Sequence, residues 1–165
     1  IAIKNLEMAY EAVGERLDVL MVSGADFGTQ NGLMWSPDIY RELYKPFHML
    51  VNRWVHEHTP WKVFFHTCGS IVKLMDEFIE VGVDILNPVQ GSAAGMDLGF
   101  LKEKYGDKVT FWGGGVDTQK TLPFGSPEEV EEEVRERIEI LGKDGGFVFA
   151  TVHNIQAGVP IENLF

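Results

Sequence analysis

The sequence predicts an α/β fold whose strands form one parallel sheet. Five short apolar segments alternate along the chain with longer segments that have helical apolar spacing. Most of the apolar segments are continuous, as expected for strands that are covered on both faces. Each also ends in a polar or glycine-rich group. Strands that alternate with helices in this way are typical of parallel α/β proteins.

The composition describes a globular chain that can bury a core. Its 165 residues include 25 acidic and 14 basic ones, which gives a formal net charge of −11, and 45% are hydrophobic. This length is typical of one domain. The acidic balance argues against non-specific binding to nucleic acid or to anionic membranes. No apolar run reaches the roughly 18 residues that a membrane span needs.

The single cysteine, Cys68, excludes an internal disulfide and suits a reducing compartment, so we expect a cytoplasmic protein. The chain begins at Ile1 rather than at a methionine, and it ends at Phe165, just after the sequence indicates the start of a further helix. We therefore expect it to be part of a longer protein.

The first half of the chain predicts three helices and two strands. Ser36 is a helix N-cap that is followed by Pro37 at the first helical position, and Pro46 is expected to kink the helix that follows. Ser70 is expected to cap the next helix. The predicted elements are a helix over 3–15, a strand over 17–22, a helix over 37–58, a strand over 61–67 and a helix over 71–81.

The second half repeats the alternation. Ser126 and Pro127 open a helix whose first turn is acidic, and we interpret the acidic run 128–136 as a solvated helix face. Pro160 marks one more helix start. The predicted elements are a strand over 84–89, a helix over 97–105, a strand over 109–112, a helix over 127–141 and a strand over 147–152.

The polar residues at the strand ends predict a single pocket. In parallel α/β folds the functional site forms at the carboxyl ends of the strands. If the five strand ends meet, the pocket would combine one polar group from each strand. These groups are Asp26, His66 with Cys68, Asn87 with Gln90, Asp117, and His153 with Asn154.

His66 and Cys68 form the sharpest motif. Residues two apart on a strand share a face, so both side chains would point into the mouth of the pocket. Imidazole and thiolate are ligands that zinc prefers, and His153 could supply a third. Two other interpretations stay open: a buried structural pair, or Cys68 as a nucleophile activated by the start of the following helix.

The remaining candidates would shape the pocket. Asp26 and Asp117 could carry protons or orient a ligand, or they could cap loops. The run 113–115 lacks both the GxGxxG and the P-loop pattern, so it predicts close backbone approach to a ligand or strand rather than nucleotide binding. The expected substrate-binding residues are Trp35, Asn87, Gln90, Gly114 and Asn154.

These motifs resemble one family. The segments FFHTCG (64–69), DILN (84–87), WGGGVD (112–117), VHNIQ (152–156) and VPIEN (159–163) are similar to the C-terminal part of the uroporphyrinogen decarboxylase superfamily. That superfamily includes methylcobamide:coenzyme M methyltransferases and corrinoid-dependent demethylation proteins. The resemblance implies that 1–165 is one domain forming about the last five βα units of a (β/α)8 TIM barrel. A partial barrel has open edges, so we also expect self-association through them.

The branches of the superfamily imply different chemistry. In the methyltransferase branch a His-x-Cys pair, here His66 and Cys68, and a cysteine, where this chain has His153, hold a zinc ion that activates a thiol toward a methyl-corrinoid. The corrinoid would be carried by a partner protein, and the other substrate would be a small molecule. In the decarboxylase branch of porphyrin biosynthesis, His153 would contact substrate without a metal. The His-x-Cys pair favours the first branch. A third interpretation is that the chain is a barrel fragment that is catalytically incomplete.

Overall fold

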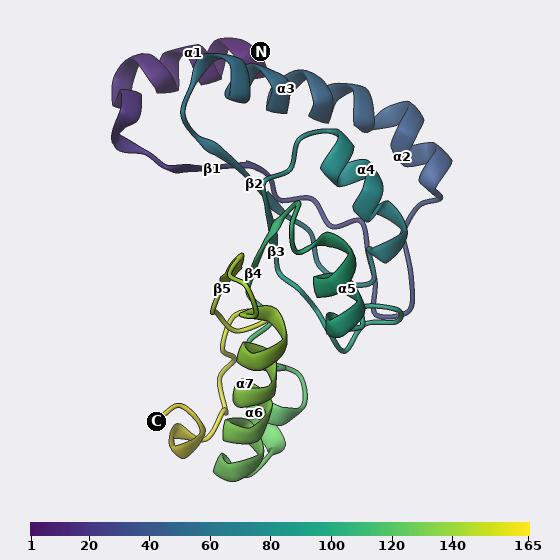
Figure 1. Ribbon diagram of the computed structural model, residues 1–165, viewed down its shortest axis with the longest axis vertical. Coiled ribbons are helices and arrows are strands. Elements are labelled where there is room, and N and C mark those ends of the chain that lie inside the picture. Colours follow the sequence, from purple (N-terminus) through teal and green to yellow (C-terminus); the bar gives the residue numbers. More distant parts are fainter.

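A computed structural model describes residues 1–165 and contains one five-stranded sheet (Figure 1). All four strand pairs are parallel, and the strands lie side by side in the order of the sequence. This confirms the predicted α/β class with parallel strands. The strands are β1 (Val19–Ser23), β2 (Lys62–His66), β3 (Ile85–Asn87), β4 (Thr110–Trp112) and β5 (Phe147–Val148).

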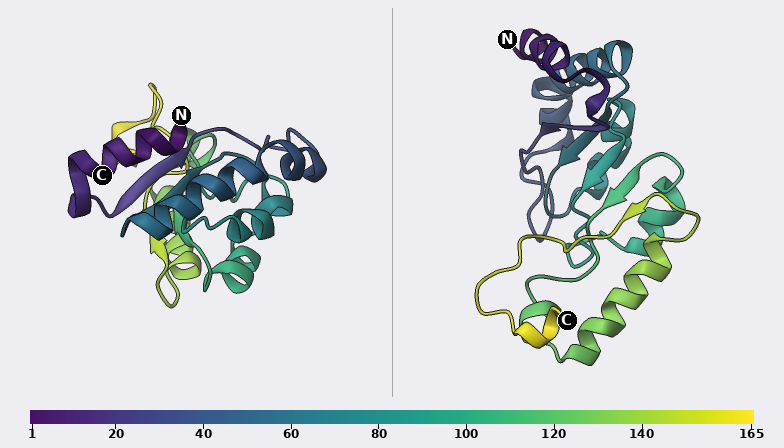
Figure 2. Two further views of the ribbon diagram at one scale, coloured as in Figure 1. Left: turned by 90° about the horizontal axis from the view of Figure 1, so that it is seen from above. Right: turned by 90° about the vertical axis from the view of Figure 1, so that its left-hand side faces the viewer.

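The main helices lie along one side of the sheet (Figure 1). The two ends of the chain lie at opposite ends of the molecule, beyond the first and last strands (Figure 2, right). None of the helices combines the length and the apolar character that a membrane crossing requires. The helices are α1 (Ala2–Val13), α2 (Pro37–Leu43), α3 (Lys45–His58), α4 (Met75–Glu80), α5 (Leu98–Tyr105), α6 (Thr121–Phe124) and α7 (Pro127–Leu141), with 3-10 turns η1 (Gly14–Arg16), η2 (Val72–Leu74) and η3 (Ile161–Asn163).

The two faces of the sheet have different surroundings. Val63 and Phe65 of β2 are fully buried on the helix-covered face. Phe64 and His66 alternate with them and are only half-buried, and Phe64 meets Trp112 of β4 edge-on at 5.4 Å between ring centroids. The predicted division of β2 into two faces is therefore confirmed.

The helix expected over 37–58 is interrupted. Tyr44 separates α2 from α3 with φ −116° and ψ −46°, and Pro46 lies in the first turn of α3. A proline has no N–H to donate and crowds the preceding turn, so it fits the start of a helix better than its interior. The chain therefore makes two helices where a kinked one was predicted.

Ser70 does not cap a helix, contrary to the sequence prediction. Its hydroxyl donates to the carbonyl of Ala94 at 2.5 Å, and the segment after it starts as the 3-10 turn η2 before α4 begins at Met75. The contact with a distant loop replaces the local cap.

The last strand is shorter than the predicted 147–152. Regular pairing stops at Val148 because its partner β4 runs into Gly113 and Gly114, both at φ +92°. That backbone conformation breaks a regular ladder and suits glycine. Single hydrogen bonds continue beyond it, from Gly115 N to the Ala150 carbonyl at 2.8 Å for example.

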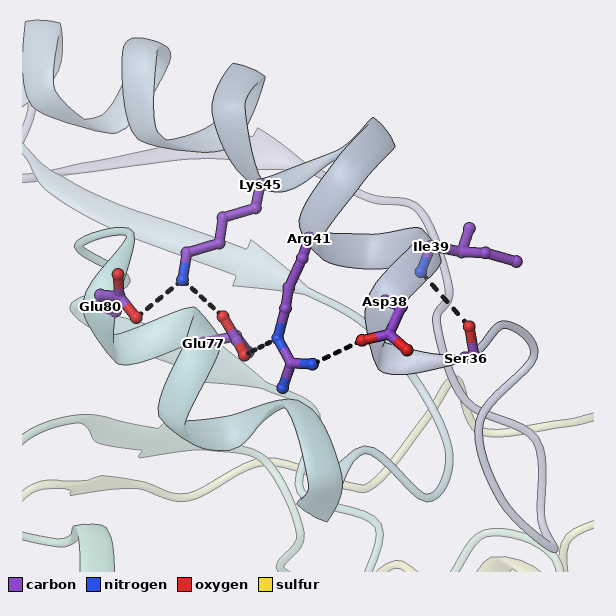
Figure 3. Close-up of polar contacts among 7 residues, drawn as sticks. All are labelled: Ser36, Asp38, Ile39, Arg41, Lys45, Glu77 and Glu80. Atoms are coloured by element: carbon purple, nitrogen blue, oxygen red, sulfur yellow. Dashed lines mark hydrogen bonds and ion pairs between the residues drawn. The ribbon is translucent and has the colours of Figure 1, made fainter.

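The ion-pair cluster of Asp38, Arg41, Lys45, Glu77 and Glu80 joins α2 and α3 to α4 (Figure 3). Glu77 lies at its centre with only 11% of its side chain exposed, and it accepts from Arg41 Nε at 2.5 Å and from Lys45 Nζ at 2.6 Å. The hydrogen bond from Lys45, supported by Arg41, lowers the pKa of the Glu77 carboxyl although partial burial opposes this. The stabilising contribution is therefore present at neutral pH and lost as the pH falls through the lowered pKa.

We expect Glu77→Gln to lower the free energy of unfolding by about 1–2 kcal/mol at pH 7, since the bonds to charged partners are lost while half-exposed Arg41 is partly screened by water. The difference from wild type should shrink at acidic pH, where the wild-type carboxyl is protonated as well. Urea unfolding at pH 7 and pH 3 measures both effects. The control is Glu80→Gln, whose exposed side chain pairs with Lys45 alone and should change stability by less than about 0.5 kcal/mol. Equal losses in the two variants would contradict the central role of Glu77.

The outer strands leave the sheet open. β1 and β5 each have one neighbour only, and Met21 of β1, on the face without helices, is 60% exposed. Unpaired edges beside apolar side chains promote strand pairing between molecules.

We therefore expect this 165-residue chain, expressed alone, to self-associate with increasing concentration. Met21→Lys should weaken the association, because a charge on an edge strand disfavours pairing. Phe124→Lys is the control, since Phe124 is 84% exposed but lies on α6 away from the sheet. Light scattering after size-exclusion chromatography measures the mass, and a monomer at every concentration would contradict the expectation.

Candidate functional site

A pocket of about 440 Å³ lies at the carboxyl ends of the strands. Residues that follow each of the five strands line it, as the polar strand ends predict. A site at this edge of a parallel sheet is the common arrangement in α/β enzymes. The lining residues are Asp26, Gly28, Thr29, Gln30, Cys68, Gly69, Gln90, Asp117, Thr118, Gln119, Val152 and His153.

Asp26, His66 and Cys68 form a compact donor group at one side of this pocket. The Cys68 sulfur lies 3.6 Å from Nε2 of His66, and one donor atom from each of the three residues lies within 4.8 Å of the other two. The backbone N–H of Cys68 donates to Oδ1 of Asp26 at 2.8 Å and holds this carboxylate in place. Imidazole, thiolate and carboxylate are the three side-chain donors that zinc accepts.

Asn87 orients the imidazole of His66. The side-chain N–H2 of Asn87 donates to the carbonyl of Trp112 at 2.9 Å, so its Oδ1 is the atom that faces Nδ1 of His66, at 2.6 Å. An amide oxygen only accepts, so Nδ1 of His66 carries the proton. The lone pair is then on Nε2, the atom that faces Cys68. This is the outer-shell arrangement typical of histidines that bind metals.

The surroundings of Cys68 keep its thiol protonated. Burial first, and then the charge and hydrogen bond of Asp26, raise the pKa of the thiol to about 11. The expected helix start next to Cys68 is also absent, because α4 begins only at Met75. The thiol therefore lacks the two features that would activate it as a free nucleophile, a lowered pKa and a nearby helix N-terminus. A cation in the donor group would favour the thiolate instead.

His153 lies on the pocket wall but outside the donor group of three. Asp26, which the sequence analysis treated as a proton carrier or ligand-orienting residue, is the residue that the structure places beside His66 and Cys68. The prediction that His153 contributes a ligand is thus not matched by this arrangement, and its exposed imidazole is available to a molecule in the pocket.

Five predicted residues lie outside the pocket lining: His66 and Asn87, which contact each other behind Cys68, and Trp35, Gly114 and Asn154. Trp35 and Asn154 are exposed, in the segments that follow β1 and β5. Gly114 is buried, and a Cβ at this position would come within 2.7 Å of the Val89 carbonyl oxygen. The structure thus accounts for Gly114 by close backbone packing, the reading that the sequence favoured for this glycine run.

Asp117 combines a loop-capping role with a place in the pocket wall. Its Oδ1 accepts from the backbone N–H of Gln119 at 2.7 Å and of Lys120 at 3.1 Å, while its own N–H donates to Glu133 of α7 at 3.2 Å. The other carboxylate oxygen makes no hydrogen bond within the chain. Both sequence interpretations of Asp117, as a loop cap and as a pocket residue, are compatible with this geometry.

Four polar residues of the pocket were not predicted from the sequence, the neighbouring pairs Thr29 with Gln30 and Thr118 with Gln119. Glutamine is common on surfaces, so the residue type alone carries little signal. Their positions were the available signal, because each follows a predicted pocket aspartate, Asp26 or Asp117, by a few residues.

The comparisons with known proteins agree with this architecture. The family model for uroporphyrinogen decarboxylase (URO-D) matches residues 3–165. A curated relative, the uroporphyrinogen decarboxylase of Mannheimia succiniciproducens, is 25% identical over 167 residues, which cover 97% of this chain and 45% of the relative. The solved structure of a methyltransferase from Methanosarcina mazei matches with a TM-score of 0.69 and 20% identity, over 99% of this chain and 43% of the other.

The chain thus spans less than half the length of either protein. At 20% identity the structural match establishes a shared fold, a partial barrel of parallel strands. The family match extends over almost every residue described above, from α1 to η3. The chain therefore belongs to the uroporphyrinogen decarboxylase (URO-D) family.

Proposed function

We propose that the chain carries the zinc site of a methyl-transfer enzyme that works with a corrinoid. The observation that carries this proposal is the donor group of Asp26, His66 and Cys68, with the imidazole already turned so that Nε2 is its free donor. The likeness in fold to a methyltransferase supports the same branch. Because the chain spans less than half of its relatives, the activity is proposed for the protein of which it forms this part.

The donor set fits a zinc ion in chemistry and in number. Three protein ligands and one open position are typical of catalytic zinc sites. When bound there, zinc would act as a Lewis acid that lowers the pKa of a thiol substrate and so favours its thiolate.

The residues of the chain supply the rest of the arrangement. Asn87 holds the proton on Nδ1 of His66. Cys68 would hold the metal as a thiolate, having released its proton to solvent. Asp26 is held in place by the N–H of Cys68. We assign to Asp117, which lines the same pocket and has one carboxylate oxygen free of hydrogen bonds, the role of accepting the proton of an incoming thiol. A free thiol ligand also fits the reducing cytoplasm.

A metal-free decarboxylase is the second candidate. The curated relative carries that name, and His153 is exposed on the pocket wall where it could contact substrate carboxylates. Metal analysis separates the two candidates. Purified protein should bind one zinc ion per chain after loading and dialysis, and a folded chain that retains no zinc would favour the decarboxylase. Activity of the longer protein, compared with this segment alone, decides whether the segment is catalytically incomplete.

The role of Asn87 gives a further test. We expect Asn87→Leu to weaken zinc binding by about 10–100-fold, because the imidazole of His66 loses the partner that fixes its tautomer. Competition with a chromogenic chelator measures the affinity. Asn5→Leu, on the exposed part of α1, is the control and should bind zinc as wild type does. Unchanged affinity in Asn87→Leu would contradict the orienting role.

A further inference from the structure

Three glutamines from three different loops form a continuous chain of side-chain hydrogen bonds, the amide relay. The relay starts at the backbone N–H of Gly69, which donates to Oε1 of Gln90 at 3.0 Å. Nε2 of Gln90 donates to Oε1 of Gln30 at 2.8 Å, and Nε2 of Gln30 donates to Oε1 of Gln119 at 2.8 Å. All four residues line the pocket beside the donor group.

The relay has a single direction. A backbone N–H can only donate, so the atom of Gln90 that meets Gly69 must be its oxygen. That choice sends the N–H2 of Gln90 toward Gln30, and the same logic repeats at Gln119. Gln90 is only 5% exposed, so water cannot readily take the place of its partners. Gln90, at the buried end, therefore fixes the orientation of all three side-chain amides, including that of Gln119 at the exposed end.

The relay ends on a free donor. Oε1 of Gln119 is used by Gln30, and the N–H2 of Gln119 makes no hydrogen bond within the chain. The backbone of Gln119 is held by Oδ1 of Asp117, which keeps this residue at the pocket wall. An oriented amide with unused donors is a common means of recognising a ligand oxygen.

The charged residues of the pocket decide whether it favours a charged or a neutral ligand oxygen. Asp26 and Asp117 are the charged lining residues besides the titratable His153 and Cys68, and neither lysine nor arginine lines the pocket. In the metal-free pocket a carboxylate ligand would meet like charges without a lysine or arginine partner, whereas a neutral carbonyl oxygen accepts a hydrogen bond without that repulsion.

We propose that the N–H2 of Gln119 binds a neutral carbonyl oxygen of the substrate, and that Gln90 sets this preference from the buried end of the relay. This inference rests on the proposed function in one respect, that the molecule bound in this pocket is the substrate of the enzyme. Gln90→Glu at pH 8 reverses the direction of the hydrogen bonds in the relay. Both oxygens of the introduced, ionised carboxylate can only accept, so the side-chain amide of Gln30 and then that of Gln119 must rotate by half a turn. The pocket would then present an oxygen of Gln119 instead of its N–H2.

The test uses metal-free, 15N-labelled protein and two small probes. N,N-dimethylacetamide has a carbonyl acceptor and no donor, while methylammonium has donors and no acceptor. In wild type, dimethylacetamide should shift the side-chain amide resonances of Gln119 and methylammonium should not. In Gln119→Glu, affinity for dimethylacetamide should fall at least about 10-fold, the loss of one hydrogen bond. Gln90→Glu should show the same loss, with the Gln119 amide protons newly protected from exchange by Gln30.

Asn31→Asp is the matched control for added charge. Asn31 lies next to Gln30 on the exposed loop, its side chain makes no hydrogen bond, and this variant should keep the wild-type preference. Gln119→Glu keeps the test decisive if Gln90→Glu fails to fold, because Gln119 is exposed. Wild-type affinity for dimethylacetamide in Gln119→Glu would overturn the proposal. The result does not depend on zinc, so a failure of the metal site would be seen separately in the zinc content.

Discussion

Cys68→Ser is expected to abolish stoichiometric zinc binding. The substitution keeps the shape of the side chain but replaces a thiolate, the strongest zinc donor of the group, by a hydroxyl that stays protonated. The loss should exceed about 100-fold in affinity, the upper end of what removal of an outer-shell partner costs. Zinc content after dialysis and chelator competition measure it, and circular dichroism verifies that the variant folds.

The pH dependence of zinc binding gives an independent check on the same residue. The pKa of the Cys68 thiol is raised to about 11, so the thiol must release a proton when it binds metal at neutral pH. The contribution of Cys68 to zinc affinity should therefore rise about 10-fold per pH unit between pH 7 and pH 9. Cys68→Ser should lose this slope. A serine variant that binds one zinc ion with the wild-type pH dependence would contradict the proposed site.

The sequence predicts the chemistry of β2 but not the third donor. Side chains alternate between the two faces of a strand, which places His66 on the pocket side of β2, and the structure places Cys68 beside it. Asp26 lies forty-two residues before Cys68, and their contact depends on how closely two loops approach. A Cβ on Gly28 would come within 2.7 Å of the Cys68 carbonyl oxygen, and Gly69 has φ +83°. Such contacts between glycines have no periodic pattern that a sequence can reveal.

The other differences between the sequence predictions and the structure also arise from contacts between residues far apart in the sequence. The sequence around Ser70 predicts a helix cap, but the hydroxyl of Ser70 donates to the distant carbonyl of Ala94 instead. Gln90 was predicted from its place after a strand, but the relay depends on Gln30 and Gln119, which lie 60 residues before it and 29 after it in the sequence. The elements with strong local signals were predicted well, as α7 shows: its capping box between Ser126 and Glu129 is present.

Phe27→Ala is expected to be the most destabilising single substitution near the site. Phe27 is almost fully buried and meets Tyr40 and Tyr44 edge-on, at 5.4 and 5.1 Å between ring centroids, while it stacks on Phe65 at 6.2 Å. Truncation of such a side chain costs about 3–5 kcal/mol, through lost burial and the cavity that remains. For a chain of this size each kcal/mol lowers Tm by about 2–4 °C. Thermal unfolding measures the change, and a shift below about 2 °C would contradict the central position of this ring in the core.

The same substitution tests whether the core positions the donor group. Phe27 directly follows Asp26, and its backbone N–H donates to the buried hydroxyl of Thr67 at 2.9 Å. The ring packs in the core and so holds this part of the backbone against the end of β2. Phe78→Ala is the matched control, because Phe78 is equally buried in the same cluster but lies on α4. Both variants should lose similar stability, and both should be assayed for zinc at a temperature where they remain folded. Only Phe27→Ala should then bind zinc more weakly: alanine keeps the backbone N–H that Thr67 accepts, but it loses the ring packing that holds the backbone next to Asp26. Equal zinc affinities in the two variants would mean that the hydrogen bond from Cys68 alone is enough to hold Asp26.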